Sequence, residues 1–155
     1  MKLSDLSEVK KSKGRTQVPV VVAEPEKKSV AIEQCPLFLD SYIEKVRSNK
    51  VLLNKIATFL RKKVEDPLIP VGNDRPLLSK GSYGSMVPGI WHAHLNLDIS
   101  IWYVYVGGSK PALKLYGVFT HEETGTGQPA KIQKQQTMAA KMANQKEFTP
   151  FSITQ

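Results

Sequence analysis

The sequence predicts an α+β domain, in which a small antiparallel sheet carries an N-terminal helical hairpin on one face, with one more helix near the C-terminus. Three observations support this prediction. Between residues 37 and 65 the apolar residues recur at helical spacing, about every 3.6 residues. Residues 91–105 and 112–120 form two strand-like runs with a Gly-Gly-Ser-Lys turn between them. Residues 129–146 return to helical spacing.

Composition sets the class of protein. The chain has 155 residues, of which 41% are hydrophobic, and this is enough for one domain with a real core. Its net charge of +8 favours a polyanionic partner, either nucleic acid or an acidic protein. We expect no membrane segment, because no apolar run approaches the roughly 18 residues that would be needed. The single Cys35 fits a reducing, cytoplasmic location and is interpreted as a packing residue.

The chain divides into three parts. Residues 1–28 read as a basic, disordered arm, with the patch Lys10–Arg15 and the Pro-broken linker Glu24–Lys28. Residues 29–127 hold the folded domain. Residues 128–155 hold the last helix and a loose tail that begins near Phe148.

The first half of the domain predicts a strand followed by a helical hairpin. A short strand is expected over residues 29–34, and Pro36 suits the first position of a helix. Ser48-Asn49 divides the helical region, and Asp66-Pro67 ends it, because the residue before a proline disfavours helical geometry.

The second half predicts strands. Residues 67–90 are rich in loops, with a possible strand from Leu77 to Tyr83. One continuous strand is then expected over 91–105. It is followed by its antiparallel partner over 112–120, which delivers His121 at its end.

Residues 91–105 carry the strongest functional signal. Side chains alternate between the two faces of a strand, so this run separates by parity. One face would be apolar, with Trp91, Ala93, Leu95, Leu97, Ile99, Ile101 and Tyr103. The other would form the floor of a site, with His92, His94, Asn96, Asp98, Ser100 and Trp102.

All three histidines of the chain lie on these two strands or at their end. If the strand is straight, His94 and Asp98 are about 13 Å apart along it, too far for a direct pair. Two imidazoles and a carboxylate on a basic protein nevertheless suggest general acid–base catalysis, because imidazole titrates near neutral pH. Cleavage of RNA through its own 2′-hydroxyl requires such a base, an acid and cations for the phosphate.

Two other interpretations remain open from the residues alone. The His92-Ala93-His94 spacing allows two ligands on one ion, and Asp98 or His121 would complete a zinc site. The same residues also fit a plain solvated strand face with no chemistry.

Four segments together resemble the RelE/ParE superfamily of toxin–antitoxin toxins, above all the YafQ-type mRNA interferases. These segments are Asp74–Leu77, Gly81–Tyr83, Ala93–Tyr103 and Thr120–His121, and the resemblance extends over roughly residues 29–127. YafQ has similar D-H-P-L…G-S-W, A-H-V-E-P-D-W-I-L-I-Y and T-H pieces in the same order. The resemblance implies a RelE-like fold and a ribosome-dependent endoribonuclease that cleaves mRNA without a metal or other cofactor.

The resemblance also implies roles for single residues. His94 and Asp98 align with a catalytic His and Asp, and His121 aligns with the terminal His that protonates the leaving group. Arg75 stands where the family has another His, so it would bind phosphate without exchanging protons near pH 7. A cognate antitoxin, mRNA and the ribosome are the implied partners.

Three further positions differ from the family pattern. The family has an Arg before the Ala-His pair, where this chain has Trp91 or His92. It has another Arg four residues before the terminal His, where this chain has Gly117. It has a Phe four residues after that His, where this chain has Gly125. We therefore assign phosphate binding to other polar and basic residues: Arg75, His92, Lys80 and Lys114, with Lys131 as a further cation. These differences favour a second hypothesis, a non-catalytic module that binds RNA, the ribosome or a protein on the same fold. A metal-dependent hydrolase on His92, His94 and His121 is the third.

Overall fold

A mixed six-stranded sheet lies at the centre of the protein in the computed structural model, which describes residues 29–77 and 82–153. In spatial order the strands are β4 (Arg75–Pro76), β5 (Ile90–His94), β6 (Ile99–Val106), β7 (Ala112–Thr120), β3 (Ala31–Gln34) and β8 (Thr149–Pro150). The predicted α+β class is confirmed. The sheet is not wholly antiparallel, because β3 and β7 run parallel. The described part of the chain between these two strands contains three helices and three strands, so it is long enough for a crossover connection.

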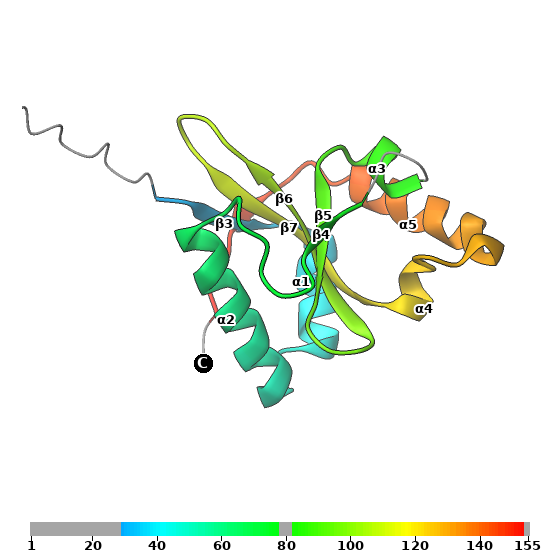
Figure 1. Ribbon diagram of the computed structural model, residues 1–155, viewed down its shortest axis with the longest axis horizontal. Helices are drawn as coiled ribbons and strands as arrows, with labels where there is room; N and C mark the ends of the chain where they lie inside the picture. The colour runs from blue at the N-terminus through cyan, green and yellow to red at the C-terminus, as the bar shows by residue number, and fades with distance from the viewer. Residues whose placement is uncertain (1–28, 78–81, 154–155) are drawn as a thin grey trace, which may run out of the picture.

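The helices cover both faces of the sheet (Figure 1). α1 (Pro36–Lys45) and α2 (Lys50–Glu65) pack on one side. α3 (Ser82–Met86) and α5 (Ile132–Ala143) pack on the other. The turn α4 (His121–Thr124) and a 3-10 turn (Pro129–Lys131) connect β7 to α5. None of the helices in the described ranges is long and apolar enough to cross a lipid bilayer.

The predicted helical hairpin is confirmed in its start, break and end. Pro36 occupies the first turn of α1, where its missing N–H costs no hydrogen bond. The side chain of Asn49 accepts a hydrogen bond from the Leu52 amide (3.1 Å) and so caps α2 at the predicted break. Asp66 ends α2 just before Pro67.

Each face of the sheet has its own hydrophobic core. The side chains of β5 and β6 alternate between the two cores, odd-numbered residues on one side and even-numbered residues on the other. Ala93, Ile101 and Tyr103 face the core under α1 and α2. Ile90 and Trp102 face the core under α3 and α5. The face predicted to be the floor of a site is therefore partly covered, and only its end near His94 is open to solvent.

The prediction of one continuous strand over 91–105 is wrong. The chain reverses at residues 95–98, because the Asn96 side chain accepts hydrogen bonds from the amides of Asp98 (2.8 Å) and Ile99 (2.6 Å) and closes a tight turn. Leu97, assigned to the apolar face, lies at the turn with 96% of its surface exposed. The predicted assignment of residues to the two faces still holds within the strands. Even-numbered residues of β5 pair with even-numbered residues of β6, as His94 does with Ser100.

Two other segments also differ from expectation. Ser82 and Tyr83 lie in α3 and not in a strand, since Tyr83 packs its ring on Trp102 at 4.6 Å; residues 78–81 lie outside the described part. The expected loose tail instead forms β8 against β3. It is held there by Phe151, whose ring lies 5.2 Å from that of Phe38.

Candidate active site

His94 and His121 meet at the open edge of the hairpin. His94 is the last residue of β5, and His121 is the first residue of α4, directly after β7. Their Nε2 atoms lie 3.2 Å apart, and their ring centroids 5.2 Å apart. Because a hydrogen bond between two imidazole nitrogens needs a proton on one of them, one ring donates and the other accepts.

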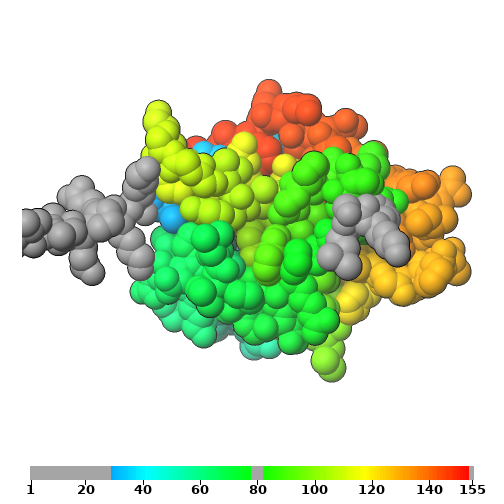
Figure 2. Space-filling view, turned by 45° about the horizontal axis from the view of Figure 1, so that its top comes forward, coloured from blue at the N-terminus to red at the C-terminus, as the bar shows by residue number. Residues whose placement is uncertain are grey.

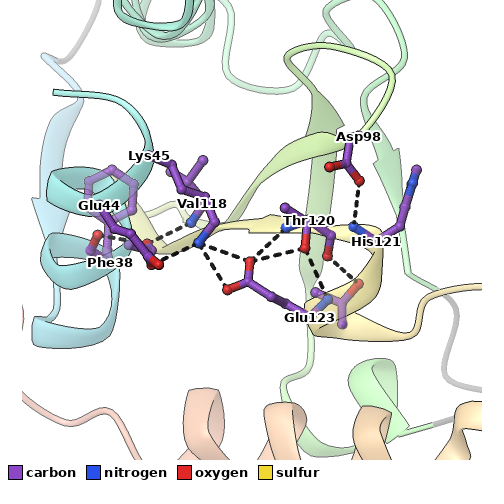
Figure 3. A network of polar contacts seen from close by, with 10 residues as sticks. Phe38, Glu44, Lys45, Asp98, Val118, Thr120, His121 and Glu123 are labelled. Atoms are coloured by element: carbon purple, nitrogen blue, oxygen red, sulfur yellow. Dashed lines mark hydrogen bonds and ion pairs between the residues drawn. The ribbon is translucent and has the colours of Figure 1, made fainter. Parts of the chain in front are cut away.

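A capping box and contacts from two other segments hold the short helix that begins with His121 (Figure 3). Thr120 and Glu123 form a reciprocal capping box at the start of α4. The His121 amide donates to the carbonyl of Asp98 at 3.2 Å and approaches its carboxylate at 3.3 Å. Lys45 of α1 pairs with Glu123 at 2.9 Å. The β5–β6 turn and α1 therefore both hold the short helix that carries His121.

His92 extends the cluster into the protein. It is 8% exposed, and its ring lies 5.4 Å from that of His94 and 5.2 Å from that of Trp102. Within the described residues, the buried Nδ1 atoms of His92 and His94 have no hydrogen-bond partner. Three imidazoles thus lie in a row from the core to the surface.

The surroundings favour the neutral form of two of these rings, because they lower the pKa of His92 and of His94. Burial lowers the pKa of His94, and the neighbouring His121 and Arg75 lower it further. Burial also lowers the pKa of His92, against the opposing effect of a hydrogen bond with the Arg75 backbone. A neutral imidazole is able to accept a proton near pH 7.

The structure places the other predicted residues unequally. Arg75 is exposed on β4, paired with His92 across the strands, and so lies beside the cluster. Asp98 is exposed in the β5–β6 turn, and its contact is with the His121 backbone. Lys114 lies six residues before Thr120, about 20 Å along β7, with its ammonium over the Phe148 ring. Lys80 falls outside the described residues.

Sequence reasoning missed a buried ion pair behind Arg75. Lys63 of α2 is 1% exposed and contacts the Asp74 carboxylate at 2.9 Å. Tyr103 donates its hydroxyl to the same carboxylate at 2.7 Å. These contacts fix the residue that precedes β4 and therefore position Arg75. Asp74 belongs to a segment that carries the family resemblance, which is the one signal that pointed to it.

Gly117 explains one difference from the family pattern. A Cβ atom built at this position would lie 2.1 Å from the ring of Phe119. Gly117 pairs with Trp102, and Phe119 belongs to the core under α3 and α5. The volume that a longer side chain would need is already filled by an aromatic ring.

The cation Lys131 is already paired. Lys131 and Lys134 both contact the Glu122 carboxylate at 2.9 Å. Hydrogen bonds from Lys134 and Lys131 lower the pKa of Glu122 to about 2, so this carboxylate stays charged next to His121.

In the described ranges, no group of three or more His, Cys, Asp or Glu side chains is arranged to hold a metal ion.

Comparisons with known proteins establish the fold. The YoeB/ParE toxin from Agrobacterium tumefaciens superposes with a TM-score of 0.50 and 19% identity, over 59% of this chain and 99% of that chain. The YoeB dimer from Staphylococcus aureus gives a TM-score of 0.48 and 17% identity, over 61% and 99%. YafQ from E. coli gives 0.43 and 22%, over 60% and 94%. No family model and no curated protein matches the chain. The Agrobacterium toxin shows that this chain has the fold of a YoeB/ParE toxin, which confirms the predicted RelE/ParE-like fold.

Proposed function

We propose that the protein is the toxin of a type II toxin–antitoxin system and cleaves mRNA on the ribosome. The observation that carries the proposal is the 3.2 Å contact between the Nε2 atoms of His94 and His121. Two imidazoles in hydrogen-bond contact supply one proton acceptor and one proton donor. The basic chain and the toxin-like fold support RNA as the substrate class.

In the proposed reaction His94 is the base and His121 the acid. His94 takes the proton of the 2′-hydroxyl, and the 2′-oxygen forms a bond to phosphorus while the bond to the 5′-oxygen breaks. His121 gives its proton to that leaving oxygen. The products are a 2′,3′-cyclic phosphate and a free 5′-hydroxyl. A proton passed directly from His94 back to His121 resets the pair.

The remaining residues have supporting roles in this proposal. The scissile phosphate lies against the solvent-exposed side of the His94–His121 pair, and the exposed Arg75 contributes a fixed positive charge there. His92 is buried behind His94, and its ring supports the His94 ring at a centroid distance of 5.4 Å. Asp98 holds the His121 backbone and so sets the position of the acid.

The test is cleavage of mRNA on programmed ribosomes by purified protein, mapped by primer extension. Wild type should produce discrete cuts with cyclic phosphate or 3′-phosphate ends. His94→Gln and His121→Gln should each reduce the cleavage rate at least about 100-fold, the usual contribution of a general acid or base. Gln136→Ala, an exposed position on α5, serves as the control and should cleave like wild type.

Expression in cells provides a second test of the same proposal. Wild type should arrest translation, and His121→Gln should not. The family resemblance also implies a cognate antitoxin, whose co-expression should relieve the arrest. If neither wild type nor His121→Gln arrests translation, and mRNA on ribosomes stays intact, the enzymatic proposal is wrong.

A non-catalytic binding module is the second candidate. The observation that favours it is the Phe119 ring in the space beside Gly117, where the family carries a phosphate-binding Arg. This module would bind RNA, the ribosome or a protein and leave RNA intact. Ribosome binding by wild type without any cut over long incubation would support this candidate against the first.

A further inference from the structure

Two hollows meet at His94, on the side of the site that faces α2. The first has a volume of about 320 Å³ and the second of about 510 Å³. Lys55, His94 and Leu95 line both, so the hollows form one groove that begins at the proposed base. Both volumes fall in the range of roughly 300–1,000 Å³ that is usual for small-ligand sites.

The first hollow combines an apolar floor with a polar rim. Phe59, Val71 and Leu95 provide apolar surface, and the ring of Phe59 is held edge-on against Tyr103 at 5.6 Å. Asn54 and Thr58, four residues apart on α2, provide hydrogen-bonding groups on one side. Apolar surface next to amide and hydroxyl groups is suited to a nucleobase, which needs both contact with its face and hydrogen bonds at its edge.

The second hollow is more polar than the first and carries a positive charge that is free of ion pairs among the described residues. Asn73 and Asn96 line it together with Lys55. Lys55 is exposed, and no ion pair found in the described residues includes it. Its neighbours three and four positions away along α2 are Leu52, Val51, Thr58 and Phe59, none of them acidic. Its charge is therefore available for a phosphate.

We propose that this groove binds one nucleotide of single-stranded RNA next to the scissile bond, with its base in the first hollow and its phosphate on Lys55. The inference rests on the proposed function, because His94 joins the groove to the catalytic pair. α2 and the loop after it, which supply most of the lining, share one face of the molecule (Figure 2). The free cation and the neighbouring imidazoles favour RNA over a protein as the occupant.

The experiment measures binding of a fluorescent hexanucleotide whose riboses are 2′-O-methylated, so that it cannot be cleaved. Lys55→Met should weaken binding about tenfold and reduce the slope of log K against log[salt] by about one contact. Thr58→Trp, which fills the first hollow, should weaken binding by a similar factor, in line with base contacts, and leave the slope unchanged. Asn54→Ala provides a second, smaller change in case the Trp variant does not fold.

The matched control is Lys62→Met, which removes an exposed cation from the same helix outside the groove and should bind within about twofold of wild type. Binding of an uncleavable RNA does not depend on catalysis, so this result is independent of whether wild type cuts mRNA. If Lys55→Met and Asn54→Ala bind like wild type, or if wild type does not bind this RNA, the inference is wrong. Loss of antitoxin binding with unchanged RNA binding would assign the groove to protein and would also overturn it.

Discussion

The space beside Gly117 is closed by a single ring. Because a Cβ there would meet Phe119 at 2.1 Å, any side chain forces the ring or the strand to move. Gly117→Ala should lower the free energy of unfolding by about 1–3 kcal/mol, the usual cost of overpacking. Urea denaturation measures this change.

Gly107→Ala is the matched control for this prediction. A Cβ at Gly107 would lie 3.7 Å from the Tyr105 side chain, which is ordinary contact. This variant should stay within about 0.5 kcal/mol of wild type. If Gly117→Ala loses as little stability as Gly107→Ala, the Phe119 ring moves aside easily. Position 117 would then be able to accept an Arg.

The low pKa of His92 predicts a pH-dependent stability. In the unfolded chain a histidine titrates near about 6.5, and burial lowers the pKa of His92 in the folded state. Between these two values the unfolded chain binds more protons, so the free energy of unfolding should fall as the pH falls below about 7 and level off below the folded pKa. His92→Phe, an aromatic replacement without a titrating group, should reduce this fall.

Urea midpoints at pH 7.5 and 5.5 measure the effect. Trp102→Phe is the control, because it changes the packing against His92 without removing an ionisable group and should keep the full pH effect. If the free energy of unfolding falls by the same amount in wild type and in His92→Phe, protonation of His92 does not cause the pH dependence.

The catalytic candidates could be predicted from the sequence only in part. The alternation of residues placed His92 and His94 on one face, and β5 keeps them there. The meeting of His94 with His121 could not be predicted, because it depends on the register of β7 against β6, where Ile99 pairs with Thr120. The turn at Asn96 was hidden because Leu95, Leu97 and Ile99 continue the strand-like pattern through it.

At the scale of elements, the ion pair between Lys63 and Asp74 joins α2 to the segment before β4. Both side chains are buried, and Lys63 also donates to the Ile69 carbonyl at 2.9 Å. Lys63→Ala leaves the Asp74 carboxylate without its buried cation, so we expect a loss of about 3–5 kcal/mol in the free energy of unfolding. Lys62→Ala, the exposed neighbour, should stay within about 0.5 kcal/mol.

The two variants are compared by urea denaturation at the same pH. A similar small change for both would show that the pair contributes nothing beyond a surface contact, and Arg75 would then need another source of positioning. A large loss for Lys63→Ala alone supports the role of the pair in fixing the start of β4.

Elements with strong local signals were predictable, and elements that depend on distant contacts were not. α1, α2 and β7 have clear periodicity, α1 begins at Pro36 and α2 at the Asn49 cap, and their predicted positions are confirmed. α3 has only five residues, with a glycine among them, and depends on the packing of Tyr83 against Trp102. β8 has two residues and depends on Phe151, which packs against α1 more than 100 residues earlier in the chain.

At the scale of the whole molecule, the positive charge is distributed unevenly with respect to the histidine cluster. Arg75 lies beside His92, while Lys114 lies at the far end of β7 over Phe148. Lys131 and Lys134 are neutralised in part by Glu122. The net charge of +8 therefore does not measure the number of cations that reach RNA at the site.

This distribution predicts which cations control the salt dependence of RNA binding. Each phosphate contact on single-stranded RNA contributes about −0.7 to the slope of log K against log[salt]. Arg75→Gln should therefore make the slope less steep by about 0.7. Lys114→Gln removes the same charge from the chain and should leave the slope unchanged. Fluorescence anisotropy with the uncleavable hexanucleotide at several salt concentrations measures both. If Lys114→Gln changes the slope as much as Arg75→Gln does, RNA runs along β7 to its far end, and the phosphate site is larger than the histidine edge.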